Sequence, residues 1–168
     1  MIVEQKNLLE SVVWGGSGFE RCVYDFIVEN VKEGSTVVEF GSGNVSTRVL
    51  GNKYKLFSVE HDGKWLSYPE YTTYIHAPIK DGWYDTQILE KKLPPQIDFL
   101  LVDGPSGAGF NHRDGLMQNL NIIKNCKQIL FHDTWRPMET QLAKEVAKKL
   151  HKKIEFFTHG DYWAYLWN

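Results

Sequence analysis

Short apolar runs alternate along this chain with segments whose hydrophobic residues recur at helical spacing. The apolar runs are rich in β-branched and aromatic residues, and turn-forming residues follow them. They predict strands over residues 36–40, 56–59, 71–76, 97–102, 128–131, 154–158 and 162–167. Strands that alternate with helices are typical of a parallel sheet with helices on both faces, so we expect an α/β fold.

The helical spacing predicts helices over residues 18–32, from about 45, around 64–67, over 85–91 and 112–124, and over about 137–150. Ser17 and Glu20 form an S-x-x-E capping box at the start of the first helix. Pro137 suits the first turn of the last helix. The two strand-like segments after it flank a turn that contains Gly160, which predicts a closing antiparallel hairpin.

The length of 168 residues predicts one domain, spanning residues 1–168. Hydrophobic residues make up 42% and charged residues 24%, as in an ordinary soluble protein. The formal net charge of −2 gives no electrostatic reason to expect a nucleic acid or a membrane as partner. No signal peptide and no apolar run of membrane-spanning length is visible. We expect a cytoplasmic monomer or homodimer in which Cys22 and Cys126 are buried thiols.

Polar and acidic groups follow five successive predicted strands, although the strands themselves are apolar. These groups begin with Glu39 and the Gly41-Ser42-Gly43 turn, and continue with Glu60-His61-Asp62, His76, Asp103-Gly104-Pro105 and His132-Asp133-Thr134. Ligands of open α/β sheets bind at the carboxyl ends of the strands. The pattern therefore predicts one shared site at this edge of the sheet.

The first two strand ends indicate a nucleoside ligand. The glycines at 41 and 43 let the backbone approach a ligand closely, and Glu39 favours a ligand that carries an ammonium group. Glu60 lies where an acid usually accepts hydrogen bonds from ribose hydroxyls. Taken alone, the glycines fit a tight strand–helix turn, and Glu60 or Asp62 fits a helix N-cap.

The segment Val38–Thr47 resembles motif I of the class I S-adenosylmethionine-dependent methyltransferases, which reads E/D-x-G-x-G. Val59-Glu60 resembles their second motif, Ile97–Asp103 the motif of their fourth strand, and the closing hairpin their final antiparallel strand. The resemblance implies a Rossmann-like, seven-stranded sheet in the order 3-2-1-4-5-7-6 and S-adenosylmethionine as cofactor. The cofactor-binding residues that it implies are Glu39, Gly41, Ser42, Gly43, Glu60, His61 and Asp103.

Asp103 and His132-Asp133 end neighbouring strands and point to the acceptor side. Oxygen methylation needs a deprotonated or polarised hydroxyl, which a carboxylate, an imidazole or a divalent cation can provide. The layout is similar to the cation-dependent catechol and caffeoyl-CoA O-methyltransferases, with His132 as a departure. That similarity implies that Asp103, His132 and Asp133 are catalytic and bind a divalent cation such as Mg²⁺, Mn²⁺ or Co²⁺.

A second resemblance indicates a sugar acceptor. Val102–Pro105, His112–Met117 and Phe131–Asp133 are similar to segments of the plant glucuronoxylan 4-O-methyltransferases. The expected acceptor, a glycan or another small molecule, would contact His112 and Arg113, and the flat rings of Trp14 and Trp135 suit a sugar. The alternative for His112 and Arg113 is an exposed first turn of helix, and for the tryptophans, Trp65 included, simple packing.

Two other functions stay open at this point. An NAD-dependent oxidoreductase would need G-x-G-x-x-G, but Ser46 stands where the third glycine belongs. A binding module could keep the S-adenosylmethionine site without turnover.

Overall fold

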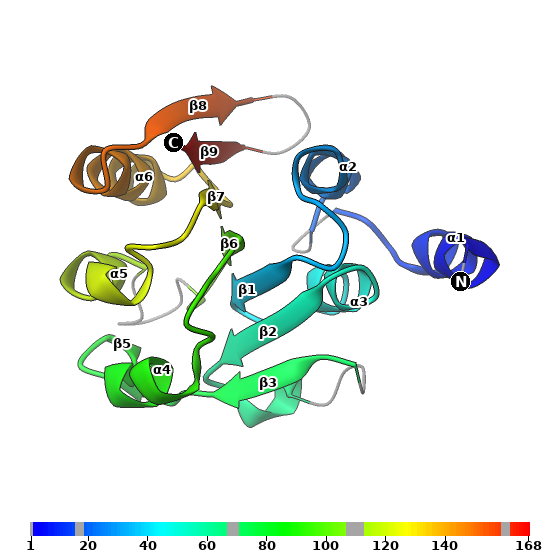
Figure 1. Cartoon of the computed structure of the whole chain (residues 1–168), viewed down its shortest axis with the longest axis horizontal. Coiled ribbons are helices and arrows are strands. Elements are labelled where there is room, and N and C mark those ends of the chain that lie inside the picture. The colour runs from blue at the N-terminus through cyan, green and yellow to red at the C-terminus, as the bar shows by residue number, and fades with distance from the viewer. Residues whose placement is uncertain (1, 16–18, 67–70, 107–112, 159–161) are drawn as a thin grey trace.

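A seven-stranded sheet in the order β3-β2-β1-β6-β7-β9-β8 forms the centre of the molecule (Figure 1). The computed structural model describes residues 2–15, 19–66, 71–106, 113–158 and 162–168. The strands of this sheet are β1 (Thr36–Phe40), β2 (Lys55–Glu60), β3 (Thr73–His76), β6 (Phe99–Val102), β7 (Gln128–Phe131), β8 (Lys153–Phe157) and β9 (Trp163–Trp167). The first five run parallel, and β9 is antiparallel to both β7 and β8. The predicted α/β fold, strand order and closing hairpin are confirmed.

Helices cover both faces of this sheet (Figure 1). One face carries α2 (Arg21–Asn30) and α3 (Ser46–Gly51), and the other carries α4 (Thr86–Lys92), α5 (Gly115–Gln118) and α6 (Pro137–Lys149). Strand β6 is buried on both sides, with Leu100 and Val102 in one apolar cluster and Phe99 and Leu101 in the other. This two-sided burial is why the strand reads as a continuous apolar run.

The N-terminal region differs from the prediction. A helix that was not predicted, α1 (Ile2–Ser11), precedes the sheet, and α2 begins at Arg21 instead of 18. Glu20 is the N-cap residue of α2 with an extended backbone and no side-chain cap bond, so the predicted capping box is wrong. The reason is that Phe19 is buried and its carbonyl accepts a hydrogen bond from Gly15 N instead of from a helical backbone. Ser17 itself lies outside the described residues.

The predicted helix over 112–124 is broken within the part that the structure describes. Only α5 and a 3₁₀ turn, η2 (Leu120–Ile122), form there. The side-chain amide of Asn119 donates to the Gly115 carbonyl at 2.7 Å, which is the acceptor that a continuing helix would use for its backbone. The predicted helix around 64–67 is likewise a 3₁₀ turn, η1 (Gly63–Trp65).

A small hairpin of β4 (Ile79–Lys80) and β5 (Trp83–Tyr84) was also missed. Its turn residues Asp81 and Gly82 have φ values of 53° and 82°, as a two-residue hairpin turn requires. The Asp-Gly pair was the available sequence signal.

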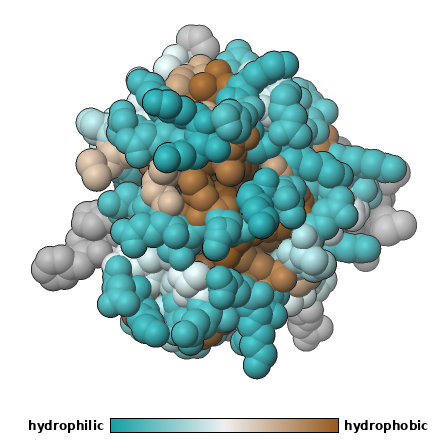
Figure 2. Space-filling view, turned by 60° about the vertical axis from the view of Figure 1, so that its left-hand side comes forward, coloured by the Kyte–Doolittle hydropathy of each residue, from teal (hydrophilic) through white to brown (hydrophobic). Residues whose placement is uncertain are grey.

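The side of the molecule on which α4, α5 and α6 lie shows hydrophobic atoms in a hollow between hydrophilic ridges (Figure 2). A cavity of about 330 Å³ lies on the same side, lined by Leu89, Leu93, Ile97, Ile122 and Cys126 among others. Neither cysteine forms a disulfide, and Cys126 is buried as predicted, whereas Cys22 is exposed. Among the described residues, no helix has the length and apolar character to cross a bilayer.

The close approach of Gly41 to Gly104 generates a stability prediction. Gly41 has a φ of 94°, and a Cβ there would lie 2.9 Å from Cα and N of Gly104. Gly34 has a φ of 76°, but a Cβ there would meet nothing within 4 Å. We expect Gly34→Ala to lower the free energy of unfolding by roughly 1–2 kcal/mol through left-handed strain. Gly41→Ala should lower it by roughly a further 1–3 kcal/mol through the clash. Urea denaturation of both variants checks this, and equal losses would contradict the contact.

Candidate active site

The carboxyl ends of β1, β2, β6 and β7 surround one cavity of about 420 Å³. Its lining includes Gly41, Ser42, Gly43, Glu60, His61 and Asp103 from the predicted cofactor set, and Arg113 and Asp133 from the acceptor side. A cavity of this size is typical of small-molecule sites. The prediction of one shared site therefore holds for four of the five strand ends. The fifth group, His76, is exposed and contacts the carbonyl of His61 at 3.1 Å from outside this lining.

Glu39 holds the glycine loop in place from below. Its side chain is fully buried, and Oε2 accepts hydrogen bonds from Ser58 Oγ at 2.6 Å and Thr47 Oγ1 at 2.7 Å. Thr47 Oγ1 in turn accepts from the backbone N–H of Gly43 at 2.9 Å. Burial raises the pKa of Glu39 to about 7, against the opposing effect of the neighbouring hydroxyl groups. Glu39 therefore supports the glycine loop from beneath the cavity and is not itself part of the lining.

Glu60 connects the end of β2 to the same loop. Its Oε2 accepts from the Ser42 N–H at 3.0 Å, and its Oε1 accepts from the N–H groups of His61 and Asp62 at 2.6 and 2.8 Å. A carboxylate offers about four lone-pair positions, so Oε2 retains one for a ligand hydroxyl. Asp62 caps η1 by accepting from Lys64 N at 3.0 Å, as the N-cap alternative anticipated for it.

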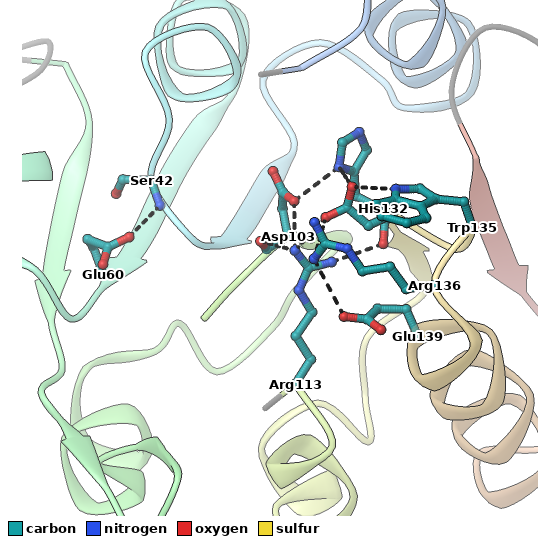
Figure 3. Close-up of polar contacts among 9 residues, drawn as sticks. Ser42, Glu60, Asp103, Arg113, His132, Trp135, Arg136 and Glu139 are labelled. Carbon is teal, nitrogen blue, oxygen red and sulfur yellow. Dashed lines mark hydrogen bonds and ion pairs between the residues drawn. The ribbon is translucent and has the colours of Figure 1, made fainter. Parts of the chain in front are cut away.

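On the acceptor side, Asp103, His132 and Asp133 converge as predicted (Figure 3). His132 Nδ1 lies 3.0 Å from Asp103 Oδ1 and 3.7 Å from Asp133 Oδ1. The Asp103 carboxylate lines the cavity, whereas the His132 ring is buried behind it, 5.8 Å from the ring of Phe19. The group that faces a ligand is thus the carboxylate of Asp103, and His132 supports it.

Arg113 occupies the middle of this cluster. Its Nη2 lies 3.2 Å from Asp103 Oδ1 and 2.9 Å from Asp133 Oδ2, and also donates to the Asp103 carbonyl at 2.6 Å. Its Nη1 donates to the His132 carbonyl at 3.0 Å. The residue is 5% exposed, so the alternative of an exposed helix turn is wrong for Arg113. The guanidinium group reaches both acids and both strand ends at once.

Asp133 contacts every residue in the outer part of the cluster that Figure 3 labels, except Glu139. Its φ of 61° is a left-handed conformation that Asp tolerates better than most residues, and it turns the chain at the end of β7. Besides Arg113, its carboxylate contacts Arg136 Nη1 at 3.1 Å and accepts from Trp135 Nε1 at 3.3 Å. Arg136, which lines the cavity, was missed by the sequence reasoning. Its spacing of three residues from Asp133 was the only signal.

The neighbouring positive charges keep Asp103 ionised. Burial by itself raises the pKa of this carboxyl group, but the His132 imidazole and the guanidinium groups of Arg113 and Arg136 together hold the pKa below its usual value. No described residue hydrogen-bonds the Oδ2 atom, and the side chain is 25% exposed at the cavity wall. One carboxylate oxygen is therefore available to a ligand, and in Figure 3 one Asp103 oxygen makes no contact with the other residues drawn.

Comparisons with known proteins define the fold. No family model matches the chain, and no curated protein matches it. A TehB-like SAM-dependent methyltransferase from Corynebacterium glutamicum superposes with a TM-score of 0.59 and 13% identity, over 99% of this chain and 95% of that one. The methyltransferase domain of METTL16 gives 0.59 and 14%, over 88% and 81%. MycE methyltransferase, solved with Mg, SAH and Mycinamycin VI, gives 0.58 and 12%, and 88% of this chain matches only 48% of MycE.

This chain has a Rossmann-like methyltransferase fold. The residues at the carboxyl edge fit S-adenosylmethionine as the ligand of such a fold. Glu39 Oε1 is buried without a hydrogen-bond partner among the described residues, so this oxygen could accept a hydrogen bond from an ammonium group. Trp65, which was expected only to pack, lines the cavity next to the Glu60 end and is 40% exposed. An exposed indole there offers a face for a nucleoside base.

A divalent cation fits less well. The three predicted ligand atoms lie within 4.8 Å of one another, which is close enough for a common ion. However, Arg113 Nη2 lies 3.2 Å from Asp103 Oδ1 and 2.9 Å from Asp133 Oδ2, so the guanidinium group already stands between the two carboxylates. An ion bound to the same carboxylates would be repelled by this positive charge. The residues present do not fit a cation in addition to Arg113.

Trp14, one of the predicted acceptor-binding residues, lies elsewhere. Trp14 packs 5.6 Å from the Tyr24 ring and donates to the Leu9 carbonyl at 3.1 Å, outside the cavity lining. It therefore joins the end of α1 to α2, as the packing alternative anticipated. His112 lies outside the described residues.

The raised pKa of Glu39 generates a prediction for stability against pH. The native protein keeps a proton on this group up to a pH of about 7, whereas the unfolded chain loses it near 4.5. Between these values the native state binds more protons, so the free energy of unfolding falls as the pH rises and then levels off. The expected loss is roughly 3 kcal/mol.

Glu39→Gln is the matched variant, because an amide oxygen can still accept from Ser58 and Thr47. The difference in unfolding free energy between variant and wild type, measured by urea denaturation from about pH 5 to 8 without cofactor, should grow with pH. Parallel curves for the two proteins would show that Glu39 does not titrate in this range.

Proposed function

We propose that this protein transfers the methyl group of S-adenosylmethionine to a hydroxyl group of a sugar, and that Asp103 accepts the hydroxyl proton. The observation that carries the proposal is the Asp103 carboxylate, which lines the cavity with one oxygen held by the chain and the other open. A neutral hydroxyl is a poor nucleophile, and a positioned carboxylate can take its proton as the new bond forms.

One end of the cavity binds the cofactor, and the other end activates the acceptor. Glu60 holds the nucleoside end through Oε2, with the glycine loop fixed by Glu39 and Thr47. When bound, S-adenosylmethionine supplies a methyl group on a positively charged sulfur, which leaves as a neutral thioether. Asp103 Oδ2 would take the proton of the acceptor hydroxyl as that oxygen is methylated. Arg113 and His132 keep Oδ1 in place throughout, because they contact it at 3.2 and 3.0 Å.

Trp135 supports a sugar as the acceptor. It is 59% exposed, although the Asp133 carboxylate accepts a hydrogen bond from its indole N–H and the Arg136 guanidinium group lies 5.1 Å from its ring centre. An exposed aromatic ring that the site itself holds in position provides a flat apolar surface of the kind that packs on sugar rings. It stands beside Asp133, two residues along the chain, at the acceptor end of the cluster.

The function is tested by separating binding from turnover. Isothermal titration should show S-adenosylhomocysteine binding, weakened in Glu60→Ala by roughly 1.5–3 kcal/mol because a charged hydrogen bond is lost. Asp103→Asn should retain this binding and lose methyl transfer to a uronic-acid or hexose oligosaccharide by at least about a hundredfold. NADH and an RNA oligonucleotide serve as alternative ligands.

Each contrary outcome contradicts a different part of the proposed function. Binding of NADH in place of S-adenosylhomocysteine would favour an oxidoreductase. Cofactor binding without transfer to any acceptor would favour a binding module. Methylation of the RNA would contradict the sugar acceptor, and full activity of Asp103→Asn would remove Asp103 from the mechanism.

Two exposed tryptophans form a matched pair of variants: Trp65 lines the cavity, and Trp135 hydrogen-bonds the cavity-lining Asp133. Trp65→Ala should weaken S-adenosylhomocysteine binding by about tenfold and leave the KM of the sugar acceptor unchanged, because Trp65 stands at the Glu60 end. Trp135→Ala should raise the acceptor KM by about tenfold and leave S-adenosylhomocysteine affinity unchanged. Titration and steady-state kinetics measure the two constants, and a loss of cofactor affinity in Trp135→Ala would contradict this division.

A further inference from the structure

The Arg113 guanidinium group holds the position between two acids where a metal ion would otherwise balance their charge. It contacts Asp103 at 3.2 Å and Asp133 at 2.9 Å, and its side chain is 4% exposed. A buried charge of this kind persists only when it is paired and hydrogen-bonded. The two strand-end carbonyls of Asp103 and His132, which it also contacts, provide those further bonds.

The charges of the cluster balance without a metal ion. Asp103 and Asp133 carry the two negative charges that face the centre, and Arg113 and Arg136 carry two positive charges. Arg136 Nη1 lies 3.1 Å from Asp133 and 3.8 Å from Glu139, so its charge is shared between a central carboxylate and a peripheral one. Of the two described guanidinium groups in the cluster, Arg113 is the one that contacts both central carboxylates.

We propose that Arg113 is the permanent cation of this site, and that the site therefore neither binds nor needs a divalent metal ion. The inference deepens the proposed function, on which its catalytic part rests. A guanidinium group stays protonated at every physiological pH and donates in fixed directions. It can therefore hold two carboxylates at a fixed separation and orientation. Unlike a metal ion, it leaves no coordination position for the acceptor oxygen. The acceptor must then be activated by the open oxygen of Asp103.

Metal binding by the cluster can be measured without turnover. Removal of the guanidinium group leaves two carboxylates and an imidazole whose ligand atoms lie within 4.8 Å of one another. Such a set suits Mn²⁺, a borderline cation that accepts both oxygen and imidazole ligands. The substitution Arg113→Met, which keeps most of the apolar stem, should therefore create a metal site that wild type lacks.

The experiment titrates Mn²⁺ into metal-free protein and follows the loss of the free-ion signal by electron paramagnetic resonance. Wild type should bind no stoichiometric Mn²⁺. Arg113→Met should bind one ion per chain, on the order of a hundredfold more tightly than wild type. The double variant Arg113→Met/Asp103→Asn should lose that site. Arg136→Met is the matched control: it removes the other guanidinium group but leaves Arg113 in place, and it should bind no tighter than wild type.

Stoichiometric binding of Mn²⁺ to wild type that disappears in Asp103→Asn would overturn the inference. So would an Arg113→Met protein that is folded by circular dichroism but binds no better than wild type. If Arg113→Met does not fold, the wild-type titration still decides, together with methyl transfer after extensive EDTA treatment, which should be unchanged. Metal binding is measured without any acceptor, so a failure of the proposed methylation is distinguishable from a failure of this inference.

Discussion

One buried guanidinium group makes it possible for two carboxylates to lie side by side at the ends of β6 and β7. Asp103 and Asp133 would repel each other across a distance of a few ångströms, and the Arg113 side chain contacts both. The same group donates to the backbone carbonyls at the two strand ends, so it fixes the positions of the strands and the charges together. Removal of one partner from such a buried set is far more harmful than its net contribution suggests, because the remaining charges stay buried.

The sequence was sufficient for the sheet but not for the inside of the site. Strand β6 could be predicted because it is buried on both faces and must be apolar at every position, and parallel strands bring their carboxyl ends to one edge. The convergence of Asp103 with His132 follows from that rule. The direction of Arg113 does not, because Arg113 precedes α5 and its guanidinium group is positioned by the strand-end carbonyls and carboxylates that it contacts. The end of α5 at Asn119 does not follow from the rule either. The hydrophobic spacing around Asn119 was helical, and a single side-chain hydrogen bond overrode it.

Glu60 and Glu39, at the other end of the site, are also held by hydrogen bonds from the chain itself. Glu60 accepts from three backbone N–H groups, and Glu39 from two hydroxyl groups, before any ligand is present. These bonds order the glycine loop in the free protein, so a ligand does not have to order it on binding. The same arrangement has a cost. Glu39 supports the loop from a place that water cannot reach, and this burial raises its pKa. An incoming ammonium group would stabilise the ionised form.

The place of β9 in the sheet has a consequence for synthesis. Strands β7 and β8 come earlier in the chain, yet they pair with β9 and not with each other. While the ribosome is still making residues 163–167, β8 has no neighbour in this sheet and the edge of β7 is open. The backbone just beyond β7 is also incomplete, because Thr134 N donates to the Tyr162 carbonyl. A nascent chain released before this point would expose an unpaired apolar edge to aggregation and to the quality-control proteases, so the last few residues of the sheet also protect it from misassembly.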